Sequence, residues 1–103
     1  MYLSFDDGPQ PQATAAVMSL LEQYGIRATF FVQGNNTTAL PGVVASIRAR
    51  GHGVGNHTFD HPDLRTRTDD QIRTQLRSTQ DAIAAATGGY RPRQTVLDAI
   101  RYA

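Results

Sequence analysis

Short apolar runs alternate along this chain with longer segments whose apolar residues recur at helical spacing. Three runs bounded by turn-forming residues are predicted to be strands: residues 2–5, 28–32 and 53–56. Four segments with apolar residues three or four positions apart are predicted to be helices: residues 13–24, 40–47, 72–83 and 96–100. Polar residues 33–38 interrupt the pattern and are predicted to form a loop.

Capping signals mark the ends of the predicted helices. Gly25, Gly51 and Gly88 follow the first three helical segments, and glycine commonly ends a helix. Thr68 and Gln71 form the capping-box pattern before the third. Strands that alternate with helices in this way are typical of an α/β protein with a parallel sheet.

Candidate functional residues follow each predicted strand. Asp6 and Asp7 come after the first strand, in SFDDGP, and His57 comes after the third. Because functional groups of parallel sheets gather at the carboxyl ends of the strands, we expect these side chains at one edge. Asn35 and Asn36 follow the second strand, reach the same edge, and are candidates for substrate contacts.

A histidine pair suggests what this edge could bind. His57 and His61 are spaced His-x-x-x-His in NHTFDHPDL, so on a helix, or a loop winding into one, they can share a metal. The spacing alone favours two surface histidines, but the neighbouring carboxylates change that balance. Two adjacent carboxylates repel each other, and a bound cation would offset this repulsion. Two imidazoles and one carboxylate would bind a metal with positions open for water and substrate, which leaves the other carboxylate as a base.

Composition excludes several other classes of function. The 103 residues carry a net charge of +1, and all ten cationic side chains are scattered arginines, so there is no basic patch for nucleic acid or an anionic membrane. The absence of cysteine excludes disulfides and thiolate metal sites. No apolar run is long enough to span a membrane, and no signal-peptide pattern is present. We expect residues 1–103 to form a single domain.

The segments LSFDDGP and NHTFDH, about fifty residues apart, resemble the first two motifs of the polysaccharide deacetylases, carbohydrate esterase family 4 with its NodB-like homology domain. RATFFVQGNN between them is also similar to this family, and the likeness spans roughly residues 2–87. It implies an α/β fold in which this chain is the N-terminal part of a distorted, incomplete (β/α) barrel. Since three strands cannot close a barrel, we expect a partial catalytic domain that is poorly soluble and nearly inactive alone.

The resemblance also implies roles for single residues. Asp6 matches the catalytic base, and Asp7, His57 and His61 match the metal ligands. The metal implied is a divalent ion, most often Zn²⁺, with Co²⁺, Ni²⁺ and Mn²⁺ as alternatives. The implied reaction is hydrolysis of N-acetyl or O-acetyl groups on a polysaccharide such as chitin, peptidoglycan or acetylxylan. An extracellular or cell-envelope location is implied for the parent protein.

The chain departs from the family at the third motif, which normally reads Arg-Pro-Pro-aromatic-Gly. In one alignment Arg91 of GYRPR is the arginine that orients Asp6. In the other, GYRPR precedes the motif, which is then missing between Arg93 and Gln94. His52 is expected at the far end of the third strand, as a surface or packing residue, so no general acid is evident. A non-catalytic relative that binds metal and glycan is therefore the alternative.

Overall fold

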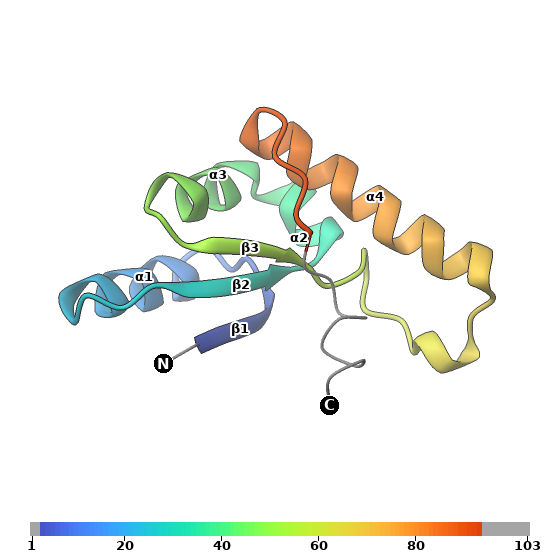
Figure 1. Ribbon diagram of the computed structural model, residues 1–103, viewed down its shortest axis with the longest axis horizontal. Helices are drawn as coiled ribbons and strands as arrows, with labels where there is room; N and C mark the ends of the chain where they lie inside the picture. The colour runs from blue at the N-terminus through green and yellow to red at the C-terminus, as the bar shows by residue number, and fades with distance from the viewer. Residues whose placement is uncertain (1–2, 94–103) are drawn as a thin grey trace.

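The computed structural model describes residues 3–93, and its three strands form one parallel sheet in the order β1-β2-β3 (Figure 1). The strands are β1 (Leu3–Gly8), β2 (Ala28–Val32) and β3 (Gly53–Asn56). The helices of this part of the chain are α1 (Ala13–Gln23), α2 (Gly34–Ala39), α3 (Pro41–Ala49), the short 3₁₀ turn η1 (Leu64–Thr66) and α4 (Asp69–Thr87). Parallel strands that alternate with helices confirm the predicted α/β fold. The predicted helix at 96–100 and the junction between Arg93 and Gln94 lie outside the described residues.

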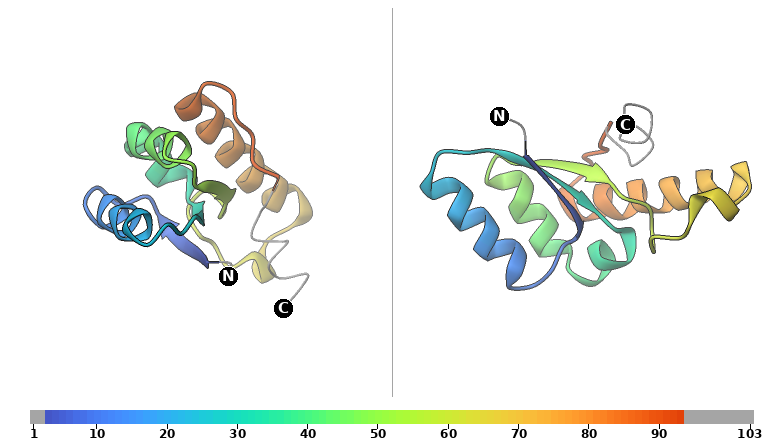
Figure 2. Two further views of the ribbon diagram at one scale, coloured as in Figure 1. Left: turned by 60° about the vertical axis from the view of Figure 1, so that its left-hand side comes forward. Right: turned by 90° about the horizontal axis from the view of Figure 1, so that it is seen from below.

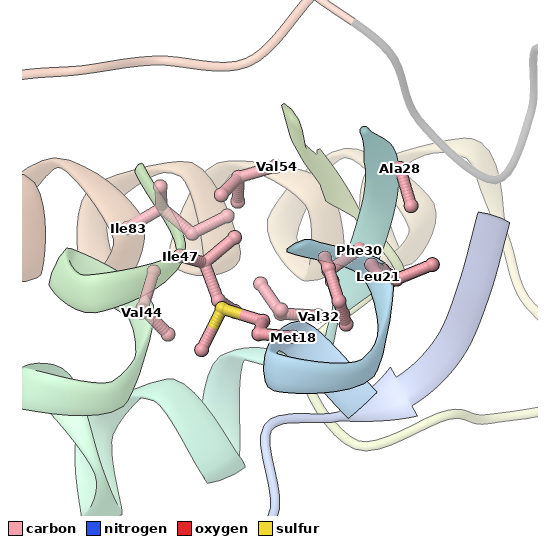
Figure 3. Packing of buried hydrophobic residues seen from close by; sticks show 9 residues of the cluster. All are labelled: Met18, Leu21, Ala28, Phe30, Val32, Val44, Ile47, Val54 and Ile83. Carbon is pink, nitrogen blue, oxygen red and sulfur yellow. The ribbon is translucent and has the colours of Figure 1, made fainter. Parts of the chain in front are cut away.

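One face of the sheet carries the hydrophobic core. Phe30 of β2 pairs in register with Phe5 of β1 and Val54 of β3, so these three side chains point to the same face. Helices α1 and α3 lie side by side on this face (Figure 2), and side chains of α4 join them there (Figure 3). The buried apolar residues are Met18, Leu21, Ala28, Phe30, Val32, Val44, Ile47, Val54 and Ile83. This packing orients β1, β2 and β3 so that their carboxyl ends lie at one edge.

Helix α1 buries only part of the stripe that its apolar residues suggest. Thr14, Met18 and Leu21 are buried, at positions that recur on one helical face. Leu20 and Tyr24, which belong to the predicted apolar pattern, are exposed. In the described part of the molecule, α1 is covered only on the face that packs against the sheet. Met18 lies on this face and is buried in the core.

The prediction of a loop over residues 33–38 was wrong, because all of these residues except Gln33 belong to α2. The Thr37 hydroxyl donates to the carbonyl of Gln33, four residues earlier, at 2.8 Å. This side-chain hydrogen bond supports the first turn of the helix. The backbone N–H of Gly34 donates to the carbonyl of Thr58 at 2.9 Å. Hydrogen bonds to a distant part of the chain therefore stabilise a helix that has no apolar periodicity of its own.

Strand β1 continues beyond its predicted end at Phe5. Asp6 and Gly8 both pair with β2, and the register shifts between them, so Asp7 is the extra residue of a bulge. The two aspartates therefore lie within the end of the strand, not in the loop that follows it. The bulge breaks the alternation of side chains between the two faces, which allows the neighbouring carboxylates to take different directions.

Helix α4 begins with the predicted capping box. The Thr68 hydroxyl accepts from the N–H of Gln71 at 3.2 Å, and the Gln71 side chain accepts from the N–H of Thr68 at 2.9 Å. Gly88, with φ at +77°, ends the helix as predicted. None of the helices in the described part of the chain is both long and apolar enough to cross a membrane.

Candidate metal centre

The carboxyl ends of β1 and β3 bring three predicted ligands to one point. Asp7 lies in the bulge of β1, and His57 follows β3 directly. The Nε2 atoms of His57 and His61 lie 2.9 Å and 3.5 Å from the same atom, Oδ1 of Asp7. One ligand atom from each of the three side chains lies within 4.8 Å of the other two. The geometry is that of a compact donor cluster.

The donor cluster has a buried side and an open side. The side chain of His57 is 10% exposed, whereas those of His61 and Asp7 are 58% and 55% exposed. Two imidazole nitrogens and one carboxylate oxygen form a donor set that zinc uses in catalytic sites, where a further position stays open. The residues present therefore fit a divalent metal that is reached from the solvent side.

Three residues of this centre have a left-handed backbone, which is uncommon outside glycine. The φ angles are +72° at Asp7, +66° at Thr58 and +60° at His61. Thr58 links the two histidines, because its hydroxyl donates to the carbonyl of His57 and accepts from the N–H of His61 at 3.2 Å. A tight loop, and not a helix, therefore turns both imidazoles toward the carboxylate.

Residues 57–61, here called the histidine loop, are held from two sides. The backbone N–H groups of Gly34 and Asn35, at the start of α2, each donate to a carbonyl of the loop at 2.9 Å. From α4, the side-chain oxygen of Gln75 accepts from the N–H of Phe59 at 2.8 Å. The loop that carries both imidazoles is therefore fixed by neighbouring helices.

Gly34 allows the close approach of α2 to the histidine loop, and we expect Gly34→Ala to destabilise the protein. A Cβ at this position would lie 2.3 Å from Cδ2 of Phe59 and 2.8 Å from the hydroxyl of Thr79. Overpacking of this kind lowers the free energy of unfolding by about 1–3 kcal/mol. Urea denaturation measures the change.

Gly42→Ala is the matched control, because a Cβ on Gly42 of α3 would meet nothing within 4 Å. Alanine favours a helix over glycine by up to about 1 kcal/mol, so this variant is expected to be unchanged or more stable. Equal denaturation midpoints for the two variants would contradict the close contact at Gly34.

A sequence profile of the polysaccharide deacetylase family matches residues 1–98. The chain belongs to this family. The peptidoglycan-N-acetylglucosamine deacetylase of Bacillus cereus is 38% identical over 91 residues, which are 88% of this chain and 33% of that protein. The chitooligosaccharide deacetylase of Rhizobium leguminosarum bv. trifolii is 40% identical over 86 residues, which are 84% of this chain and 40% of that protein.

Solved structures of deacetylases show the same arrangement of strands and helices. A family 4 carbohydrate esterase from Streptomyces lividans, in complex with acetate, superposes with a TM-score of 0.86 at 36% identity, over 92% of this chain and 48% of that chain. A T48 deacetylase with substrate superposes with a TM-score of 0.85 at 35% identity, over 91% of this chain and 46% of that chain. This polysaccharide deacetylase chain therefore matches part of the family fold and spans less than half the length of these relatives.

The other residues predicted for the edge of the deacetylase sheet take different positions. Asp6 is exposed and contributes no atom to the donor cluster. The side-chain amide of Asn36 donates to the backbone carbonyl of Asp7 at 3.1 Å, and the side chain of Asn35 accepts from the N–H of Asn36 at 2.7 Å. Gln33, which was not predicted, donates from Nε2 to Oδ1 of Asp7 at 3.2 Å. Its place directly after β2 was the only sequence signal.

Arg91 follows α4 in the chain, and its side chain contacts that helix and not the donor cluster. Its Nη1 is 3.0 Å from Oδ1 of Asp81, and both side chains are exposed. No ion pair joins Arg91 to Asp6 among the residues that the structure describes. The pairing of Arg91 with Asp6 therefore stays a prediction, and the junction between Arg93 and Gln94, on which the other alignment depends, lies outside the described residues.

His52 lies at the opposite edge of the sheet and packs in the interior. Its Nδ1 accepts from the N–H of Ala28 at 3.2 Å, and its ring meets that of Phe30 edge-on at 5.7 Å between centroids. The side chain is buried, as expected of a packing residue.

A cavity of about 440 Å³, which the sequence did not predict, opens against both imidazoles. Pro62, Leu64 and Arg65 of the segment after the histidine loop line its other side. Arg65 and Asp63 form an ion pair on this rim at 3.0 Å, and the side-chain hydrogen bond from Arg65 holds the pKa of Asp63 below its usual value. The cavity therefore offers apolar and charged groups next to the donor cluster.

Proposed function

We propose that this chain supplies the metal ligands and the base of a metal-dependent deacetylase, which hydrolyses acetyl groups on a polysaccharide. The observation that carries the proposal is the convergence of Asp7, His57 and His61, whose ligand atoms lie within 4.8 Å of one another. Asp6 stands next to them in the chain without joining the cluster. Membership of the polysaccharide deacetylase family supports the same reaction.

Asp7, His57 and His61 would hold the metal, for which zinc suits the donor set and cobalt, nickel and manganese are alternatives. When bound, a divalent ion polarises a carbonyl and lowers the pKa of a water molecule. His57 is the fixed member, because its backbone N–H donates to the carbonyl of Val32 at 3.0 Å and its ring is largely buried. The substrate would therefore approach from the side of His61 and Asp7.

Asp6 is the general base in this proposal. Its carboxylate is exposed and lies outside the donor cluster, so it is free to accept a proton. It would take the proton of the attacking water as that water's oxygen bonds to the acetyl carbon. The bond from this carbon to the sugar nitrogen would then break, and the amine would leave with a proton that an acid must supply. The two neighbouring aspartates then have different tasks, one as a ligand and one as a base. His52 cannot protonate the leaving group, because it is buried at the opposite edge.

The substrate we propose is an N-acetylated amino sugar within a polymer of the peptidoglycan or chitin type. The names of the relatives support an N-acetyl group, since they include peptidoglycan and chitooligosaccharide deacetylases. The cavity of about 440 Å³ beside His57 and His61 has the size of a small-ligand site and could take a sugar ring. A cell-wall polymer as substrate would place the whole protein outside the cell or in its envelope.

Acetate release from chitooligosaccharide, peptidoglycan and acetylxylan tests the proposal on the protein that contains this chain. We expect release from the first two substrates, loss of release with a chelator and recovery on addition of zinc. Release that survives the chelator would contradict the metal-dependent reaction, and release from acetylxylan alone would change the substrate to an O-acetyl ester. Zinc binding by calorimetry without any release would support the non-catalytic alternative. The 103-residue chain alone is expected to release little acetate.

A further inference from the structure

The turn between β2 and α2 contacts the proposed metal ligand Asp7 through side chains that no catalytic step requires. Nε2 of Gln33 donates to Oδ1 of Asp7 at 3.2 Å. Nδ2 of Asn36 donates to the backbone carbonyl of the same aspartate at 3.1 Å. Both side chains are half-buried, so they start from partly fixed positions.

The bond from Gln33 restricts the rotation of the Asp7 carboxylate. Oδ1 of Asp7 is also the atom that faces Nε2 of His57 and of His61, at 2.9 and 3.5 Å. A carboxylate oxygen has about two lone-pair sites. When the amide of Gln33 occupies one site, the other is directed to the imidazole side, where a ligand atom is needed.

The bond from Asn36 restricts the backbone that carries this carboxylate. Asp7 has φ at +72°, a conformation that a residue with a side chain adopts only when its surroundings hold it there. The Asn36 amide holds the carbonyl of Asp7, and the backbone N–H of Gln33 holds the carbonyl of Gly8 at 2.8 Å. Two successive carbonyls of the bulge are therefore fixed by the same turn.

The same turn also fixes the other half of the cluster. The N–H groups of Gly34 and Asn35 donate to the histidine loop, as described above. Residues 33–36 therefore contact both the carboxylate side and the histidine side of the centre. Because Asp7 and His57 come from separate parts of the chain, their spacing depends on an element that binds to both.

We propose that Gln33 and Asn36 are positioning residues for the metal site, which orient Asp7 as a ligand without touching metal or substrate. The proposal rests on the proposed function, because it takes Asp7, His57 and His61 to be the ligands. Loss of a group that orients a metal ligand typically lowers metal affinity by about 10- to 100-fold. We expect an effect of this size from the Gln33 amide.

Gln33→Met tests the proposal, because methionine keeps a side chain of similar length and removes the amide donor. We expect zinc affinity, measured by calorimetry on the protein that contains this chain, to fall by about 10- to 100-fold. The visible spectrum of the cobalt-loaded protein is expected to change, since it reports the ligand arrangement. Asn36→Leu is expected to act in the same direction. Gln23→Met, at an exposed position of α1, is the matched control and should bind zinc as the wild type does.

Thermal unfolding in the presence of a chelator separates positioning from folding. We expect the metal-free Gln33→Met protein to unfold within a few degrees of the wild type, which would show that the loss of affinity is local. Wild-type affinity and an unchanged cobalt spectrum in Gln33→Met would overturn the proposal, even if Asn36→Leu failed to fold. A wild type that binds zinc without releasing acetate would refute deacetylation alone, while a wild type that binds no zinc would refute both ideas.

Discussion

His57→Ala is expected to lower zinc affinity by more than about 100-fold, the upper range for loss of a group that only orients a ligand. His57 is the least exposed of the three candidate ligands and lies nearest to the Asp7 carboxylate, at 2.9 Å. With His57 gone, only one imidazole and one carboxylate remain, too few for the three-ligand site that zinc enzymes use. Acetate release by the protein that contains this chain should fall to the background rate. Calorimetric zinc titration and an acetate assay measure the two effects.

His52→Ala is the contrasting variant, because His52 is a buried histidine at the other edge of the sheet. Its loss leaves the N–H of Ala28 without its acceptor, which lowers the free energy of unfolding by about 1–3 kcal/mol. The folded fraction should still bind zinc with wild-type affinity. The ligand role of His57 would be wrong if His57→Ala lowered stability but bound zinc as tightly as His52→Ala.

Asp6→Asn is expected to lower kcat by about 10²- to 10⁴-fold, the usual contribution of a general base. Asparagine keeps the size of the side chain and cannot accept the proton of the attacking water. Because Asp6 is outside the donor cluster, zinc affinity should stay within a few-fold of the wild type. Steady-state acetate release and zinc titration on the same preparation check the two expectations together.

The control for this variant is Asp70→Asn, which makes the same change at an exposed position in the first turn of α4. It should leave kcat unchanged. If Asp6→Asn lost zinc binding in parallel with kcat, Asp6 would be a ligand and the base would have to be sought elsewhere.

Local patterns predicted the three strands, and one geometric rule placed the aspartate pair and the histidines at one edge, whereas the choice of Asp7 over Asp6 as the ligand came from the resemblance to the deacetylases. Apolar runs identify β1, β2 and β3, and carboxyl ends of parallel strands share an edge. The sequence did not predict α2, because its reason for being helical is a set of hydrogen bonds to the histidine loop. The buried stripe of α1 was predicted only in part, since which helical face is covered depends on where the sheet lies.

The contacts around the candidate ligands were harder to predict than the ligands themselves. Asn36 was expected to contact substrate, yet its amide is bound to the backbone of Asp7, and Gln33 had no distinguishing feature in the sequence. Both interactions depend on the bulge at Asp7, which appears only when β1 and β2 are paired. Arg91 was proposed near Asp6 from a motif alone, and the structure places it on Asp81 instead.

The left-handed backbone of Asp7, Thr58 and His61 affects which substitutions would raise the thermal stability of this protein. A non-glycine residue held in such a conformation costs on the order of 1–3 kcal/mol, and glycine would relieve most of that. Random variants selected only for thermal resistance should therefore accumulate glycine at these three positions, and at Asp7 and His61 they would lose a proposed metal ligand. Under the proposed function, tolerance to heat and metal binding would be opposed at Asp7 and His61.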